Sequence, residues 1–293
     1  MTPSHLVQSR ELKVAVVGHV EWVRFARVPH VPRAGEVMHA HDLFEEPAGG
    51  GAVAAVQLAR LAGKAVLITA LGEDEHGRRS MERLRELGVE VWTAGRGTST
   101  RQAVTLVDDA GERTITTFGD RLEAEGADEL PWSALAEMDA VYFTAGDLDA
   151  LRAARAARVL VASPRAVYAL GRGVRLDALV LSGEDAVERR EAQRSEQEAE
   201  LTVITDGGRG GSYRGRDGQS GVWAAAIPPG ERADSYGCGD SFTAGLTYGL
   251  GAGLPVHAAL ELAARCGAVC LTGRGPYERQ LTAAELAWGS RSF

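Results

Sequence analysis

Cysteine is scarce in this sequence: the 293 residues include only Cys238, Cys266 and Cys270. Three cysteines near the C-terminal end are too few for a disulfide framework, and no two of them form the CxxC pair of many zinc sites. We therefore expect reduced thiols.

Positive charge is also in deficit. The chain has 32 Lys and Arg residues against 40 Asp and Glu residues, which gives a formal net charge of -8. Proteins that hold nucleic acid by bulk charge need an excess of the opposite sign. Nucleic acid is therefore not expected as a partner.

Long apolar runs are missing as well. No stretch reaches the roughly 18 apolar residues that a membrane helix requires. The first residues, MTPSHLVQSRELK, lack the apolar core of a secretory signal. We expect a cytoplasmic protein that has no membrane partner.

Glycine, in contrast, is abundant, with 36 residues against 10 prolines, and 45% of the chain is hydrophobic. Short apolar runs alternate with segments of helical periodicity, and glycines often stand between them. This alternation is typical of an α/β protein with a mostly parallel sheet covered by helices on both faces. The expected strands are 12–18, 64–71, 140–144, 158–162, 178–181 and 201–205, and the expected helices are 53–61, 76–87, 148–157 and two segments within 238–272.

Two stretches interrupt this rhythm, at 36–45 and 101–118. The second contains two β-rich runs around an Asp-Ala-Gly-Glu turn. We interpret both as a small antiparallel lid inserted into a single α/β domain of residues 1–293. The charged stretch 188–200, in contrast, is interpreted as a solvated helix and connection.

The most informative segment is DSYGCGDSF, at residues 234–242. Gly237, Cys238 and Gly239 precede a run with helical spacing, so their backbone amides are expected to bind an anion at a helix N-terminus. Asp240, in the first turn, is placed to take a proton from a hydroxyl that attacks a phosphorus atom. The alternative is that Asp240 only caps the helix.

This segment resembles the C-terminal signature of the ribokinase-like (PfkB) family of sugar and nucleoside kinases. Residues 46–63, EPAGGGAVAAVQLARLAG, are similar to the N-terminal glycine signature of that family. Residues 71–89 resemble its Gly-x-Asp-x-x-Gly segment, and residues 205–210, TDGGRG, resemble its nucleotide loop. The resemblance implies a three-layer α/β/α fold with a small β lid.

The resemblance also implies roles for residues of the C-terminal half. Asp240 matches the general base, and the amides of Gly237, Cys238 and Gly239 match the anion hole. A thiol at a helix N-terminus can have a lowered pKa, but we interpret Cys238 as a small residue whose backbone matters. The implied nucleotide-binding residues are Thr205, Gly207 and Gly210, and the residues implied for a monovalent cation such as K⁺ are Asp234, Gly273 and Gly275.

Departures from the family pattern concern the metal and the acceptor. Where members have Asn-x-x-Glu, this chain has Ser182 and Asp185, so Asp185 is the residue expected to position Mg²⁺ through water. Val53 stands where many sugar kinases have an acceptor-binding Asn. Near the first strand, members often have an Asn and an Asp that bind the acceptor, and Glu21 is a candidate to replace one of them. The alternative is that Glu21 only packs in the lid. The acceptor-binding residues expected from the resemblance are Glu21, Gly49, Gly50 and Gly51.

The resemblance therefore implies an ATP-dependent kinase that phosphorylates a hydroxyl of a sugar or sugar-like molecule, with Mg²⁺ and a lid that can pair into a homodimer. Two alternatives remain at this point. A nucleoside kinase of the same fold would stack the base on Trp22, Phe25 or Phe44. A non-catalytic ligand sensor would have kept the fold without the reaction.

Overall fold

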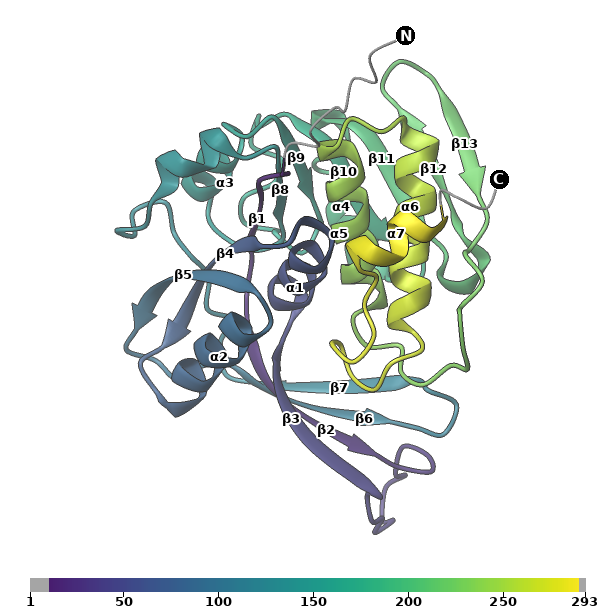
Figure 1. Cartoon of the computed structure of the whole chain (residues 1–293). Coiled ribbons are helices and arrows are strands. Elements are labelled where there is room, and N and C mark those ends of the chain that lie inside the picture. Colours follow the sequence, from purple (N-terminus) through teal and green to yellow (C-terminus); the bar gives the residue numbers. More distant parts are fainter. Residues whose placement is uncertain (1–10, 290–293) are drawn as a thin grey trace, which may run out of the picture.

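The computed structural model describes residues 11–289 and contains two sheets. The larger sheet has nine strands in the order β13-β12-β11-β10-β9-β8-β1-β4-β5 (Figure 1). Its pairings are parallel from β5 to β11, and β12 and β13 continue it as antiparallel strands. The strands are β1 (Val14–Val17), β4 (Ala65–Gly72), β5 (Val89–Arg96), β8 (Ala140–Phe143), β9 (Val159–Ala162), β10 (Leu176–Ser182), β11 (Ala199–Thr205), β12 (Gly211–Gly215) and β13 (Ser220–Trp223).

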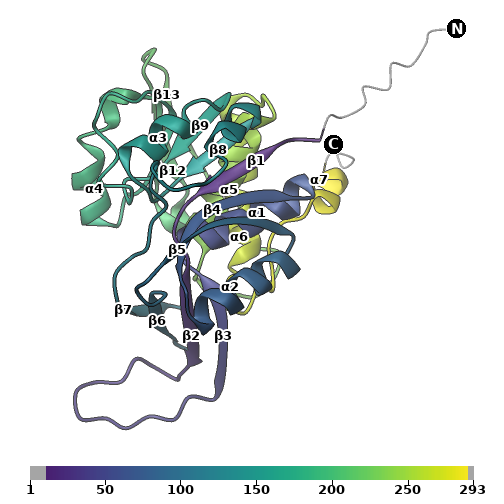
Figure 2. The ribbon, with the colours of Figure 1, turned by 90° about the vertical axis from the view of Figure 1, so that its left-hand side faces the viewer.

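Helices cover both faces of this sheet, which gives three layers (Figures 1 and 2). Strand side chains alternate between the two layers, as the pleat requires: Val14 and Val16 join one apolar cluster, while Ala15 and Val17 join the other. The first face carries α1 (Gly50–Ala62), α2 (Glu75–Glu86), α5 (Cys238–Gly251), α6 (Val256–Cys270) and α7 (Ala283–Gly289), and the second carries α3 (Leu148–Ala154), α4 (Ala186–Ala192) and the 3-10 turn η1 (Trp132–Glu137). None of the helices in the described part of the chain is long and apolar enough to cross a membrane.

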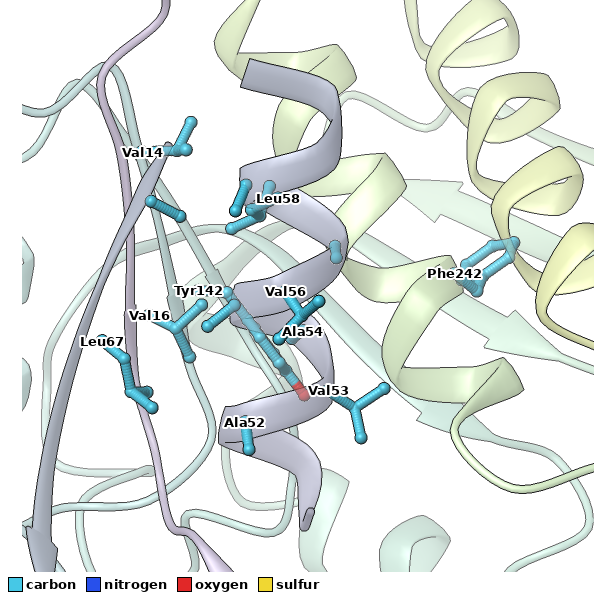
Figure 3. Packing of buried hydrophobic residues seen from close by; sticks show 14 of the residues in the cluster. Val14, Val16, Ala52, Val53, Ala54, Val56, Leu58, Leu67, Tyr142 and Phe242 are labelled. Carbon is cyan, nitrogen blue, oxygen red and sulfur yellow. The ribbon is translucent and has the colours of Figure 1, made fainter. Parts of the chain in front are cut away.

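Helix α1 is the centre of the first apolar layer (Figure 3). It is rich in alanine, and residues 52–56 have no exposed surface. Small side chains let this helix lie close to β1 and β4, while Leu58 and Tyr142 fill the larger gaps. The expected α/β fold is therefore confirmed, and the start of α1 is held firmly at one edge of the sheet.

The smaller sheet is the lid, with strand order β3-β2-β6-β7. Its strands are β2 (Glu21–Arg27), β3 (Asp42–Ala48), β6 (Gln102–Val107) and β7 (Arg113–Phe118). It lies below the large sheet in Figure 1. The β3–β2 and β6–β7 pairings are antiparallel, whereas β2 and β6 run parallel.

Three details differ from the expectations. Strand β2 belongs to the lid and was not predicted as part of it. Residues 36–41 are not strand, because the chain between β2 and β3 forms a long extended loop (Figure 2). Glu188 is 8% exposed, so the stretch 188–200 does not begin on a solvated surface.

Candidate active site

The carboxyl ends of the parallel strands meet the lid at one edge of the large sheet. Strand β1 ends at Val17, level with Phe143 at the end of β8. Only three residues separate β1 from β2, so the chain passes directly from the large sheet into the lid at Gly18, His19 and Val20. Ligands of open α/β sheets bind at this edge.

The glycine run at the start of α1 packs against this crossing. Gly49 is the helix N-cap, with a φ of 88°, a backbone conformation that favours glycine. A Cβ on Gly51 would lie 2.7 Å from the backbone carbonyl atoms of Gly18 and His19. The run therefore lets the backbone of α1 touch the β1–β2 junction.

Helix α5 begins beside the same glycines. Its N-cap is Gly237, with a φ of 79°, and no side chain accepts a hydrogen bond at this cap. Asp240 is therefore not the N-cap residue itself, and lies in the first turn of the helix. The carboxylate of Asp240 instead reaches α1, where its Oδ1 lies 3.0 Å from the position that a Cβ on Gly50 would take.

The first turn of α5 leaves room for an anion. A Cβ on Gly239 would meet open space, with no heavy atom within 4 Å, while one on Gly237 would lie 2.8 Å from a methyl carbon of Val53. Val53 is fully buried. The first turn of α5 thus packs on Val53 and is open above Gly239, and free amide groups of a helix N-terminus can bind an anion.

Electrostatics at the base combine burial with nearby arginines. Burial raises the pKa of Asp240, whereas the positive charges of Arg165 and Arg113 lower it. Burial favours the protonated form of Asp240, so its carboxylate binds a proton more strongly than an ordinary Asp, a property that suits a general base.

The pKa of the Cys238 thiol is raised, not lowered as a helix N-terminus alone would predict. A hydrogen bond with Cys270, followed by burial, raises the pKa of Cys238 well above its ordinary value. The lowered pKa that a helix N-terminus can produce is therefore overridden. A raised pKa disfavours the reactive thiolate form, and the role of the Cys238 backbone stays a prediction.

Arg165 connects the base to a neighbouring cavity of about 650 Å³. Its Nε donates to Oε1 of Glu188 at 2.7 Å, and the backbone amide of Ser182 donates to Oε2 of Glu188 at 2.8 Å. Arg165, Glu188 and Asp185 all line the cavity. A cation and two carboxylates thus line this cavity.

Asp185 is held at the start of α4. Its Oδ1 accepts hydrogen bonds from the backbone amides of Val187 and Glu188, at 2.8 and 3.1 Å. Both bonds use the same oxygen, which leaves Oδ2 for a water molecule or ion in the cavity. Sequence reasoning identified Asp185 and missed Glu188, although the two are three residues apart and both line the cavity.

The predicted nucleotide loop follows β11. Thr205 is the last residue of that strand, and its hydroxyl donates to the carbonyl of Leu181 at 3.3 Å. Gly207 and Gly210 both have positive φ, 51° and 93°. A Cβ on Gly210 would lie 2.1 Å from the carbonyl oxygen of Trp223, so only glycine fits between the loop and β13.

The predicted cation-binding segments do meet. Asp234 is 1% exposed, and its two carboxylate oxygens accept from the amides of Tyr236 and Gly275, at 2.8 and 3.1 Å. Burial raises the pKa of Asp234. Gly273 packs against Arg279 instead, since a Cβ there would lie 2.6 Å from the Arg279 amide nitrogen. Asp234 and Gly275 thus form one buried contact, to which Gly273 does not belong directly.

Glu21 is buried at the acceptor end of the site, at the start of β2. Its Oε1 lies 3.7 Å from Nε2 of His19 and 3.4 Å from Nε of Arg101. Burial raises the pKa of Glu21, and the charge of Arg101 opposes this shift. Glu21 therefore stands between a histidine and an arginine beneath the lid.

The three aromatic side chains considered for base stacking already have protein neighbours. Trp22 stacks on His76, with ring centroids 5.6 Å apart. Phe25 stacks on Phe44 at 4.7 Å, and the guanidinium of Arg274 covers the Phe44 ring at 3.8 Å. Their π faces are engaged in packing the lid.

With this geometry described, the chain can be compared with known proteins. The sequence pattern of the pfkB family of carbohydrate kinases matches residues 11–165 and 175–283. An ATP-dependent ribose-1-phosphate kinase from Halopiger xanaduensis is 27% identical, over 96% of this chain and 99% of its own length. A mouse ribokinase is 31% identical over 104 residues, and the match spans about a third of that protein, 32%.

Solved structures show the same fold. A ribokinase from Thermotoga maritima superimposes with a TM-score of 0.73 at 19% identity, covering 96% of this chain and 100% of its own. An adenosine kinase from Sinorhizobium meliloti gives a TM-score of 0.73 at 17% identity, with the same coverage. The ribokinase-like fold is thus established.

Proposed function

Since this chain belongs to the pfkB family of carbohydrate kinases, we propose that it transfers the γ-phosphoryl group of ATP to a hydroxyl of a sugar or sugar-like molecule. The observation that carries the proposal is the position of Asp240. It lies in the first turn of a helix entered through glycines, faces the α1 glycine run, and is half-buried within the influence of the Arg165 charge.

Asp240 acts as the general base. Its carboxylate accepts the proton of the acceptor hydroxyl as that oxygen forms a bond to the γ-phosphorus, while the bond from phosphorus to the β-phosphate oxygen breaks and ADP leaves. The amides of Gly237, Cys238 and Gly239 donate hydrogen bonds to the phosphoryl oxygens, whose charge is redistributed during transfer. The acceptor contacts the backbone of Gly49, Gly50 and Gly51.

The nucleotide lies along the loop after β11 in this proposal. The positive φ values of Gly207 and Gly210 let the loop turn tightly beside Thr205. The charge of Arg165 acts on Asp240, and in this proposal it stabilises the phosphates that approach that carboxylate.

The cavity carboxylates fit a role in holding Mg²⁺. Among the described residues, no three or more His, Cys, Asp or Glu side chains converge as a metal cluster. Mg²⁺ often keeps several waters and binds through one or two carboxylates plus phosphates, and Asp185 and Glu188 suit this mode. Bound there, the ion would neutralise phosphate charge.

A monovalent cation such as K⁺ is a further part of the proposal. Asp234 and the backbone of the loop that contains Gly275 would hold it, since a buried carboxylate with unused lone pairs suits a cation. Gly273 would act only through the shape of that loop.

Assays of ADP release test the proposal. Wild-type protein is mixed with ATP, Mg²⁺ and one candidate acceptor from a panel of sugars and nucleosides, with Na⁺ or K⁺ as the salt. Acceptor-dependent ADP release from at least one sugar is expected, and faster release in K⁺. Release that never exceeds the acceptor-free rate would support the ligand-sensor alternative and contradict a kinase.

The nucleoside alternative receives less support from the structure. Trp22, Phe25 and Phe44 are already stacked on other side chains, so none offers a free face to a base. A higher kcat/KM for nucleosides than for every sugar in the panel would reverse this preference.

The lid carries the proposed homodimer contact. Leu43 and Phe118, which the strand pairings place on one face of the lid sheet, are 61% and 53% exposed. Exposed apolar side chains on a small sheet are typical of an interaction surface. Sedimentation velocity of wild type and of Phe118→Lys tests the dimer, because a charge in the contact should favour the monomer.

We also propose that the enzyme is cytoplasmic and that the chain forms one domain with its lid.

A further inference from the structure

The turn of the β6–β7 hairpin lies against the segment of the main body that leads into α5. The turn spans residues 108–112, and the segment spans residues 232–236. Arg232 forms an ion pair with Glu112 of the turn. A Cβ on Gly111, whose φ is 73°, would lie 3.2 Å from the carbonyl oxygen of Ala233. The lid therefore rests directly on the chain that precedes the first turn of α5.

This hairpin binds every polar group of Ser235. The amide of Ser235 donates to the carbonyl oxygen of Gly111 at 3.0 Å. Its carbonyl oxygen and its Oγ each accept from Nη1 of Arg113, at 3.1 Å, and its Oγ also donates to Oε2 of Glu112 at 3.4 Å. Arg113 is exposed at the start of β7, whereas Ser235 is buried. Arg113 thus joins an exposed strand of the lid to a buried residue of the main body.

Ser235 stands two residues before Gly237, the N-cap of α5. The residue between them, Tyr236, is fixed at both ends: its amide donates to Oδ1 of Asp234 at 2.8 Å, and its hydroxyl accepts from the amide of Gly49 at 3.2 Å. Closely packed segments transmit a displacement instead of absorbing it. A shift of Ser235 is therefore passed on to the first turn of α5.

The guanidinium of Arg113 is also an electrostatic neighbour of the base. Its charge lowers the pKa of Asp240, as the charge of Arg165 does, while burial and the charge of Glu188 raise that pKa. The charge of Arg113 lowers the pKa of Asp234 as well. One lid side chain therefore acts on both ends of the stretch 234–240.

We propose that Arg113 is a positioning residue that couples the lid to the first turn of α5. While Arg113 holds both oxygens of Ser235, the amides of Gly237, Cys238 and Gly239 point at the transferred phosphoryl group. Without these bonds the turn is looser, and its amides stabilise the transferred group less well. Arg113 touches neither substrate in this account. The inference rests on the proposed kinase function.

Arg113→Met and Arg113→Lys test the inference through ADP release with D-ribose, D-fructose, myo-inositol and adenosine as acceptors. We expect Arg113→Met to lower kcat about tenfold with the best of these acceptors, less than the roughly 10²- to 10³-fold cost of removing a donor outright. The KM values for ATP and for the acceptor should each change less than about twofold, because Arg113 contacts neither. Arg113→Lys keeps the charge and one donor group, so its kcat should recover to within about threefold of wild type.

Arg24→Met is the matched control, because Arg24 belongs to the same lid and its guanidinium bonds to Glu45, another lid residue. It should keep the kcat of wild type. The loss in Arg113→Met should persist at high pH, where Asp240 is ionised with or without the nearby charge.

Three outcomes would overturn the inference while the kinase proposal stands: a wild-type kcat in Arg113→Met, a loss that disappears at high pH, or a loss confined to the KM for the acceptor. ADP release that no sugar or nucleoside stimulates in wild type would contradict the kinase proposal itself, and this inference with it.

Ser235→Ala approaches the same contact from the other side and covers the case in which Arg113→Met does not fold. It removes one of the two oxygens that Arg113 holds, so we expect a kcat about two- to threefold lower, in keeping with the loss of one weak hydrogen bond. Combined with Arg113→Met, it should add no further loss, because residues in direct contact are not additive. An unchanged kcat in Ser235→Ala, or an additive loss in the double variant, would contradict the coupling.

Discussion

The carboxylate of Asp240 lies directly over Gly50, with Oδ1 3.0 Å from the position of a Cβ on that glycine. Two helices that begin almost 190 residues apart in the sequence thus place a charged side chain against a residue that has none. The space kept by Gly50 is the space in which the proposal puts the acceptor hydroxyl.

Gly50→Ala should therefore impair the reaction without impairing the fold. Its φ is not positive and it is the first residue of α1, where alanine favours the helix by up to about 1 kcal/mol. We expect a melting temperature equal to or above wild type and a clear loss of kcat. Gly97→Ala, where a Cβ meets open space, is the control. Unchanged kcat in Gly50→Ala would show that the space is not used.

Gly239 and Gly237 should respond in opposite ways. A side chain on Gly239 projects into open space, so Gly239→Val should fold normally and lower turnover about 10²-fold by blocking the anion hole. Gly237→Ala combines a positive φ with a contact on Val53, so it should lower the melting temperature. Thermal denaturation together with ADP release separates the two. A Gly239→Val protein with normal turnover would contradict the anion hole.

Asp185 can be tested for a metal role separately from its capping role. Asn caps helices as well as Asp does, so Asp185→Asn should keep α4 in place while removing the charge. We expect a higher Mg²⁺ concentration for half-maximal activity in Asp185→Asn, in Asp185→Ala and in Glu188→Gln, whereas Asp185→Glu should be tolerated. Magnesium titrations at saturating ATP measure this. An unchanged midpoint in Asp185→Asn would leave Asp185 as a cap only.

The raised pKa of Asp240 also predicts an effect on stability. The folded state binds this proton more tightly than the unfolded state, so ionised Asp240 costs stability at neutral pH, and the cost vanishes as the pH falls below the ordinary Asp range. Asp240→Asn should therefore raise the melting temperature at pH 7 and lose that advantage under acid conditions. A lower melting temperature at pH 7 would mean that the attraction of Arg165 outweighs burial.

Local sequence predicted the parts of the site that depend on local structure. The glycines before Asp240 and the run at Gly49 were readable because a helix entered through small residues has a short, specific pattern. Strand β2 was missed because side chains on both of its faces are buried, so its residues lack a clear alternation.

Long-range pairing explains the other omissions. Glu188 stands in a charged run that resembles a solvated helix. Hydrogen bonds from Arg165 and from the backbone amide of Ser182, both on other segments, hold it inward. The packing of His19 against the α1 glycines likewise could not be predicted. Such contacts join segments whose spacing in the sequence has no fixed period.

The most direct test of the account is the turnover of Asp240→Asn with the sugar that wild type phosphorylates best. The variant keeps the size of the side chain and removes the proton acceptor, so we expect ATP binding close to wild type and turnover lower by about 10²- to 10⁴-fold. Asp217→Asn, on the exposed β12–β13 turn, should retain full activity. Near-normal turnover in Asp240→Asn would contradict the assignment of Asp240 as the base.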